Sequence, residues 1–228
     1  MLIADAEIEA RLKEGLRSLA SPGAAAHCDV LARFLGLLEK WNRVFNLTAV
    51  RDANEMISRH VLDSLTARPF LHGLSVLDVG TGAGLPGLPL AIVEPQRQFA
   101  LLDAGGKKIR FVQHAVGELA IGNVQVVQSR AEHYSPADPF DTVICRAFSS
   151  LPQFVDRCGS LVANGGRLLA MKGRLPEAEL AGVPAPWRVT EVAPVSVPGL
   201  VGERHIVVLE RERMEPVHLQ RRDRDTET

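Results

Sequence analysis

The stretch Val76-Leu77-Asp78-Val79-Gly80-Thr81-Gly82-Ala83-Gly84-Leu85-Pro86-Gly87 decides the fold of this 228-residue chain. It opens with an apolar run typical of a buried strand, interrupted by the acidic Asp78 close to its end. Four glycines follow, and because glycine lacks a Cβ atom, the backbone can pass close beneath a ligand before a helix begins. A tight turn alone needs a single glycine. The stretch therefore predicts a ligand-binding loop between a strand and a helix.

Downstream of this loop, short aliphatic runs alternate with helical stretches. Strands are predicted at residues 75–79, 99–103, 124–127, 142–145 and 167–171. Helices are predicted between them at residues 88–94, 107–119 and 151–161. Residues 187–195 and 205–210 have no helix between them and are expected to form an antiparallel pair that closes the sheet. The pattern predicts an α/β fold with a Rossmann-like, mostly parallel sheet and an antiparallel C-terminal strand.

Upstream of the loop the pattern is helical. Residues 1–70 lack strand signals, and apolar side chains recur at helical spacing through residues 30–41 and again through residues 56–65. We expect residues 1–70 to form a helical extension packed on the core and residues 71–210 to form the main domain. Residues 211–228 are charged and poor in large apolar side chains, so a disordered tail is expected there.

The composition narrows the class of protein. No apolar run reaches the roughly 18 residues that a membrane helix needs, and acids stand where a signal peptide would be basic. We therefore expect a cytoplasmic protein, and we expect it to be a monomer. Cys28, Cys145 and Cys158 are widely spaced, so we expect reduced thiols and no metal site. The formal net charge of −1 counts mildly against a nucleic-acid partner, although the local cluster of Lys107, Lys108 and Arg110 permits one.

Two cofactor classes compete for the glycine loop. The spacing Gly82-x-Gly84-x-x-Gly87, with an acid about 20 residues further on, also matches a dinucleotide site, so an NAD-binding oxidoreductase is the rival interpretation. Asp78 favours S-adenosylmethionine, because a carboxylate attracts the amino group of a methionine moiety and repels a pyrophosphate. After Arg146 only about 80 residues remain, which leaves little room for the second half-sheet of a dehydrogenase. The sequence therefore favours a class I S-adenosylmethionine-dependent methyltransferase.

Further cofactor contacts are expected where the next strands end. Asp103 closes the second strand, and its carboxylate is predicted to reach the ribose hydroxyls; the alternative role is a helix N-cap. Residues 129–132 follow the third strand, where polar groups can meet the adenine; the alternative is a surface turn.

The residues after the fourth strand bear on the methyl acceptor. Enzymes that methylate exocyclic amines carry an Asn/Asp-Pro-Pro-aromatic box there, whereas this chain has Cys145-Arg146-Ala147-Phe148. Cys145 could act as a nucleophile for carbon methylation, but a small core residue is the favoured interpretation. A ring nitrogen such as guanine N7 needs no general base, so Arg146 and Lys172 are predicted to act by positioning, with Phe148 beside them.

Several motifs together resemble one family. They are Trp41-Asn42-x3-Asn46-Leu47-Thr48, Arg59-His60-x2-Asp63-Ser64, the loop from Asp78 to Gly87, Gln128-Ser129-Arg130, Arg146-Ala147-Phe148 and Gly202-Glu203-Arg204-His205. In this order they resemble the ribosomal small subunit methyltransferase G family, also called glucose-inhibited division protein B. The resemblance covers roughly residues 30–210, and Cys145 stands where family members often have serine.

The resemblance implies N7 methylation of one guanine in 16S ribosomal RNA, free or in the small ribosomal subunit, in a bacterial cytoplasm with S-adenosylmethionine as donor. A methyltransferase of the same fold acting on a small molecule or a protein remains the alternative. With the glycine loop included, the expected cofactor contacts are Asp78, Gly80, Gly82, Gly84, Leu85, Asp103, Ala131, Glu132 and Arg146. The residues expected on the RNA side are Asn46, Arg51, Arg59, His60, Lys107 and Lys108, each with an alternative role in capping or on the surface.

Overall fold

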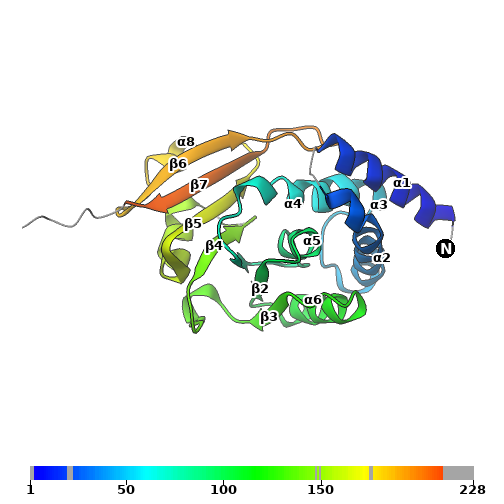
Figure 1. Ribbon diagram of the computed structural model, residues 1–228, viewed down its shortest axis with the longest axis horizontal. Coiled ribbons are helices and arrows are strands. Elements are labelled where there is room, and N and C mark those ends of the chain that lie inside the picture. The colour runs from blue at the N-terminus through cyan, green and yellow to red at the C-terminus, as the bar shows by residue number, and fades with distance from the viewer. Residues whose placement is uncertain (1–2, 20–22, 147, 149, 175–176, 213–228) are drawn as a thin grey trace, which may run out of the picture.

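A seven-stranded sheet with the order β3-β2-β1-β4-β5-β7-β6 organises the molecule in the computed structural model (Figure 1). The structure describes residues 3–19, 23–146, 148, 150–174 and 177–212. The strands are β1 (Ser75–Val79), β2 (Gln98–Asp103), β3 (Val124–Gln128), β4 (Phe140–Cys145), β5 (Val162–Lys172), β6 (Trp187–Pro194) and β7 (His205–Arg211). Strands β1 to β5 pair in parallel, and β7 is antiparallel to both β5 and β6. The predicted fold class is confirmed.

Strand β1 lies in the interior of the sheet, between β2 and β4, and is buried on both faces. Val76 packs into one hydrophobic cluster, whereas Leu77 and Val79 pack into the other. This division follows from the two-residue period of a strand, which sends successive side chains to opposite faces. Because both faces are covered, the strand is a continuous apolar run broken only by Asp78.

Helices follow the carboxyl ends of the parallel strands. They are α5 (Gly87–Val93), α6 (Gly106–Glu118), the short η4 (Ala131–His133), α7 (Leu151–Cys158) and η5 (Gly159–Leu161). Helices α5 and α6 cover one face, and α7 packs on the other with Trp187 of β6. A short helix α8 (Glu177–Leu180), which the sequence pattern did not predict, lies between β5 and β6.

The N-terminal region is helical throughout its described part. Its elements are α1 (Ile3–Ser18), η1 (Ala24–His27), α2 (Cys28–Phe45), α3 (Ala53–Met56), the π-helix η2 (Ile57–Leu62), α4 (Asp63–Leu65) and η3 (Arg68–Phe70). The apolar face of α2, including Leu31, Phe34 and Leu38, joins the same hydrophobic cluster as α5. Helix α2 begins and ends within four residues of the predicted stretch, whereas the sequence did not delimit α1. No described helix is both long and apolar enough to cross a membrane.

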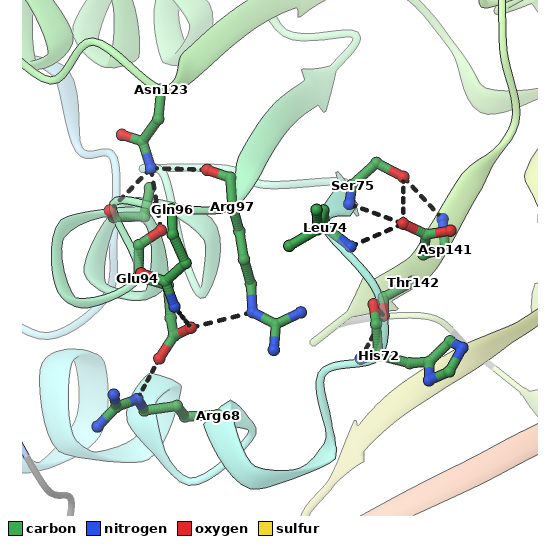
Figure 2. A network of polar contacts seen from close by, with 11 residues as sticks. Arg68, His72, Leu74, Ser75, Glu94, Gln96, Arg97, Asn123, Asp141 and Thr142 are labelled. Atoms are coloured by element: carbon green, nitrogen blue, oxygen red, sulfur yellow. Dashed lines mark hydrogen bonds and ion pairs between the residues drawn. The ribbon is translucent and has the colours of Figure 1, made fainter.

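Polar contacts hold the helices against the amino ends of the strands (Figure 2). The buried Glu94 carboxylate accepts hydrogen bonds from Arg68 Nε at 2.5 Å and Arg97 Nε at 3.0 Å. Beside it, the Asn123 amide donates to three backbone carbonyls, and Asp141 Oδ2 accepts from the backbone N–H of Ser75. These contacts fix the sheet edge that lies opposite the glycine loop. At the end of the chain, β7 continues through Arg211, and residues 213–228 of the predicted tail lie outside the described residues.

Candidate active site

The glycine loop connects β1 to α5 at the carboxyl edge of the sheet. Gly80, Gly82 and Gly84 have φ angles of 71°, 59° and 78°, a region that favours glycine. A Cβ atom on Gly80 would meet nothing within 4 Å, whereas one on Gly84 would lie 2.4 Å from Leu88. A Cβ atom on Gly87 would lie 2.1 Å from Leu101. Gly80 therefore leaves open space above the backbone, while Gly84 and Gly87 allow α5 to pack closely.

Asp78 is fully buried beneath this loop. Its Oδ2 accepts hydrogen bonds from Thr81 Oγ1 at 2.6 Å and from the Gly87 backbone N–H at 2.8 Å, so the carboxylate joins the two ends of the loop. Its Oδ1 is buried and has no hydrogen-bond partner among the described residues. Burial raises the pKa of Asp78 to about 6, although the bonds from Thr81 and Gly87 act to lower it. One oxygen therefore holds the loop, and the other is left for a donor that the described residues do not supply.

Asp103 ties the glycine loop to the end of β2. Its Oδ2 accepts from the Gly82 N–H at 2.9 Å and its Oδ1 from the Gly105 N–H at 2.7 Å, while Lys108 Nζ lies 3.6 Å from Oδ2. The N-cap position of α6 is Gly105, so the predicted alternative of Asp103 as the N-cap residue is wrong. Each carboxylate oxygen of Asp103 retains a second lone-pair direction, which is available to a ribose hydroxyl. The ribose contact stays a prediction.

A hollow of about 260 Å³ opens where β1, β2 and β3 end, and we call it the strand-end hollow. Four of the predicted cofactor residues line it: Gly80, Asp103, Ala131 and Glu132. The other five predicted cofactor residues do not line it: Asp78, Gly82, Gly84, Leu85 and Arg146. The Leu85 side chain is buried in the core, and Arg146 lines a different cavity. Phe148 and Arg157 also line the hollow; the α7 residue Arg157 was not predicted, because its position in a helix gives no signal in the sequence.

A second cavity, of about 320 Å³, lies between η2 and the strands β5 and β7, and we call it the cation cavity. Four cationic side chains line it: Arg59, Arg146, Lys172 and Arg204. Asp63 is the one acidic side chain in its described lining. An excess of positive charge in a hollow attracts anions such as phosphates.

Asp63 holds two of these arginines in place. Its Oδ1 accepts from Arg204 Nε at 3.0 Å, and its Oδ2 lies 3.5 Å from Arg146 Nη1. The same Arg146 nitrogen donates to the Arg59 backbone carbonyl at 3.0 Å. Asp63 is only 5% exposed, so its charge is screened little by water. The sequence assigned no role to Asp63 or Arg204, although both lie in motifs that carried the family resemblance.

Lys172 ends β5 and connects the two hollows. Its Nζ lies 2.9 Å from Glu179 Oε2 and donates to the Phe148 carbonyl at 3.4 Å. Glu179 Oε2 also accepts from the Leu151 backbone N–H at 2.7 Å. Since Phe148 lines the strand-end hollow, Lys172 and Glu179 brace the segment that lies between the two hollows. Ala147 of the predicted motif lies outside the described residues.

His60 lies in the lining of the cation cavity but is 4% exposed. Its Nε2 is 3.0 Å from Thr48 Oγ1, and its Nδ1 has no partner among the described residues. Burial, reinforced by the positive charge of Arg146, lowers the pKa of His60 to about 4. The imidazole is therefore neutral at pH 7 and contributes no charge toward an RNA phosphate.

The other residues predicted to face RNA fall in three places. Asn46 and Arg51 are exposed next to the end of α2, where Asn46 Oδ1 accepts from Arg51 Nη2 at 3.1 Å. Arg59 is exposed beside the cation cavity and lies 3.5 Å from Glu55. Lys107 and Lys108 are exposed at the start of α6, beside the glycine loop. The structure thus spreads these residues around both hollows.

Cys145 is buried at the end of β4. Burial raises the pKa of its thiol well above the ordinary value. A protonated, buried thiol is a poor nucleophile. The favoured interpretation of Cys145 as a small core residue fits its position, and carbon methylation through a cysteine loses its support.

The chain matches one known family over most of its length. The model of the rRNA small subunit methyltransferase G family matches residues 27–207. The chain belongs to this family. It is 48% identical over 204 residues to ribosomal RNA small subunit methyltransferase G of Stenotrophomonas maltophilia strain K279a, which covers 90% of this chain and 95% of that relative. It is 50% identical over 198 residues to the methyltransferase G of Methylococcus capsulatus, covering 87% and 96%.

Solved structures share the fold of this methyltransferase G chain. TrmN from Thermus thermophilus aligns with a TM-score of 0.54 and 20% identity, over 75% of this chain and 53% of that chain. Coclaurine N-methyltransferase, bound to N-methylheliamine and S-adenosylhomocysteine (SAH), aligns with a TM-score of 0.53 and 11% identity, over 85% and 74%. At these identities the two structures establish the fold alone.

Proposed function

We propose that the chain methylates N7 of a guanine in 16S ribosomal RNA, with S-adenosylmethionine as the methyl donor. The observation that carries the proposal is the family match over residues 27–207, supported by relatives aligned over nearly their full length. As a member of the methyltransferase G family, the chain is an S-adenosylmethionine-dependent rRNA methyltransferase, which sets the NAD-binding oxidoreductase aside.

The residues at the carboxyl edge of the sheet fit this cofactor. Asp78 Oδ1 is a buried carboxylate oxygen without a partner among the described residues, which suits the amino group of a methionine moiety. Gly80 leaves its Cα face open, and Gly80, Asp103, Ala131 and Glu132 share the strand-end hollow. In this proposal the hollow takes the adenosyl group, and Gly82, Gly84 and Leu85 act by shaping the loop rather than by lining the hollow.

The cation cavity is proposed to take the target nucleotide. When bound, the cofactor supplies an electrophilic methyl group on a sulfonium. Guanine N7 carries a free lone pair at neutral pH, so the transfer needs no group that accepts a proton first. Arg146 and Lys172 orient the acceptor through its oxygen atoms, and Asp63 keeps the Arg146 guanidinium in place. Catalysis then rests on alignment and exclusion of water.

The proposal also covers the form of the RNA substrate, the oligomeric state and the cellular compartment. We place the reaction in a bacterial cytoplasm, with a monomer acting on 16S rRNA or on the small ribosomal subunit. Residues 71–210 would form the methyltransferase domain, and residues 1–70 an extension that supplies Arg59, His60 and Asp63 to the cation cavity. Experiment must distinguish the rRNA acceptor from the alternative acceptor, a protein or a small molecule.

The test measures transfer of a labelled methyl group to three acceptors: naked 16S rRNA, assembled small subunits and bulk protein. Borohydride reduction followed by aniline cleavage then detects N7-methylguanine in the labelled RNA. We expect label in RNA with one cleavage site, and calorimetric binding of SAH but not of NAD at micromolar concentration. Label found only in protein, or label in RNA that resists aniline cleavage, would overturn the proposed acceptor.

A further inference from the structure

An aromatic surface lies at the C-terminal end of α2. Among the described residues, the exposed large hydrophobic side chains are Val44, Phe45, Leu74 and Val201. Two of them, Val44 at 70% exposure and Phe45 at 38%, are neighbours at this helix end. An isolated exposed apolar side chain is common on protein surfaces, but Phe45 belongs to a cluster of aromatic rings.

The rings of this cluster are held in a row. The Trp41 ring centroid lies 5.1 Å from that of Phe45 and 5.2 Å from that of His114 on α6. On its inner side Trp41 also packs on the buried Phe111, at 5.6 Å. We call Trp41, Phe45 and His114 the aromatic ledge. Because Phe111 anchors Trp41 from below, the exposed rings of Phe45 and His114 are fixed at the surface.

Basic side chains flank the aromatic ledge. Lys107, Arg110 and His114 are exposed and lie three and four residues apart on one face of α6. Helix α6 carries no acid before Glu118, its last residue. On the other side, Arg51 is exposed and bonded to Asn46, the residue after Phe45. Aromatic rings between cations are the combination that binds single-stranded RNA, whose bases stack while its phosphates pair with Lys and Arg.

The helices that carry the ledge lead toward both hollows of the active site. Arg33, early in α2, donates to the Glu118 carbonyl at the end of α6, whereas Trp41, later in α2, packs on His114, which lies nearer the start of α6. The Phe45 end of α2 is therefore directed toward the start of α6, where the Gly105 N–H bonds to Asp103. The chain beyond Phe45 leads to Thr48, which contacts His60 in the lining of the cation cavity.

We propose that the aromatic ledge stacks an unpaired base of the substrate RNA next to the target guanine, while Lys107, Arg110 and Arg51 contact the adjoining phosphates. This inference rests on the proposed function, because it names a second contact of the same substrate. It assigns the N-terminal extension a direct part in holding RNA single-stranded beside the site of transfer.

The experiment compares Phe45→Ala and Phe45→Trp with the wild-type chain, with Leu74→Ala as the matched control. Leu74 is an exposed apolar residue at the opposite edge of the sheet. With naked 16S rRNA, Phe45→Ala is expected to raise Kd and KM about tenfold and leave kcat within about twofold, because stacking contributes to binding. Phe45→Trp should restore binding, and SAH affinity should stay unchanged in every variant.

Lys107→Gln combined with Arg110→Gln gives an independent readout. Each cation that pairs with a phosphate contributes about 0.7 to the slope of log Kd against log salt for single-stranded RNA, so removing both should reduce the slope by about 1.4. If Phe45→Ala leaves both the RNA Kd and methylation unchanged, the proposal that the aromatic ledge stacks an RNA base is wrong, while the proposed function stands. A defect seen only with assembled subunits would assign the surface to a ribosomal protein and also overturn the stacking proposal. Failure of the wild-type chain to methylate RNA would instead refute the proposed function.

Discussion

The strand-end hollow and the cation cavity use buried carboxylates in opposite ways. Beneath the first, Asp78 accepts hydrogen bonds from the neutral donors Thr81 and Gly87 and keeps one oxygen without a partner among the described residues. In the second, Asp63 lies between the guanidinium groups of Arg146 and Arg204. The first arrangement leaves unmet negative charge, and the second leaves an excess of positive charge.

Under the proposed function, this difference would let a cationic cofactor and an anionic RNA bind at one sheet edge. In the proposed function, the carboxylate held by neutral groups attracts the protonated amino group of the cofactor's methionine moiety. The single carboxylate of Asp63 orders the two guanidinium groups of Arg146 and Arg204, and in the proposed function their net positive charge attracts the RNA. Four experiments test this contrast, in decreasing order of effect.

Asp63→Ala should have the largest effect on methyl transfer. Without the carboxylate, Arg146 and Arg204 lose their shared partner and repel each other, so kcat/KM for RNA should fall at least about 100-fold, or about 3 kcal/mol. Calorimetry should find SAH affinity within about twofold of wild type. Glu55→Gln, which removes an exposed partner of Arg59, is the control and should change kcat/KM less than about twofold. Equal losses of RNA and SAH binding would show that the two hollows are not separate.

Asp78→Asn should act on the other ligand. Because the substitution removes the charge but keeps the shape, SAH affinity should fall about 10- to 100-fold, the loss expected for a charge-assisted hydrogen bond. RNA affinity measured without cofactor should not change. Asp138→Asn, an exposed acid, is the control for net charge. Unchanged SAH affinity would mean that Asp78 only holds the loop.

Asp78 and His60 should make the free energy of unfolding depend on pH in opposite directions. Asp78 has a pKa raised from 3.8 to about 6, so its contribution is fully present below pH 4 and is lost as the pH rises through 6. His60 has a pKa lowered from 6.5 to about 4, so its contribution is present above pH 6.5 and is lost as the pH falls toward 4. Each effect amounts to about 3 kcal/mol at most.

Urea unfolding between pH 4 and 7.5 measures these slopes. Relative to the wild type, Asp78→Asn should gain stability as the pH rises from 4 to 6. His60→Gln should gain stability relative to the wild type as the pH falls from 6.5 to 4. Variant curves that run parallel to the wild-type curve would contradict both assignments.

Lys108→Gln should have the smallest effect on the cofactor. Its ammonium lies 3.6 Å from Asp103 but the side chain is exposed, so solvent weakens the pair. SAH affinity should change less than about threefold, as measured by calorimetry. A larger loss would show that Lys108 orders the Asp103 carboxylate rather than merely lying beside it.

The sheet could be predicted from the sequence because its strands are short apolar runs whose period differs from that of the helices around them. Helix α8 could not, since its four residues carry no periodic pattern. The bridge from Asp63 to Arg204 joins residues 141 positions apart, and only the folded chain brings them together. The burial of His60, likewise, depends on packing by η2, so its charge state could not be inferred from its place in the motif.

The reversed direction of β7 has a consequence for how the active site is completed. Because β7 runs antiparallel to β5, its first residue, His205, pairs with Lys172, the last residue of β5. A parallel strand of this length would begin about 20 Å away, at the far edge of the sheet. The reversal brings Arg204 from near the end of the chain to a helix near its beginning. The side-chain lining of the cation cavity is therefore complete only once β7 has joined the sheet.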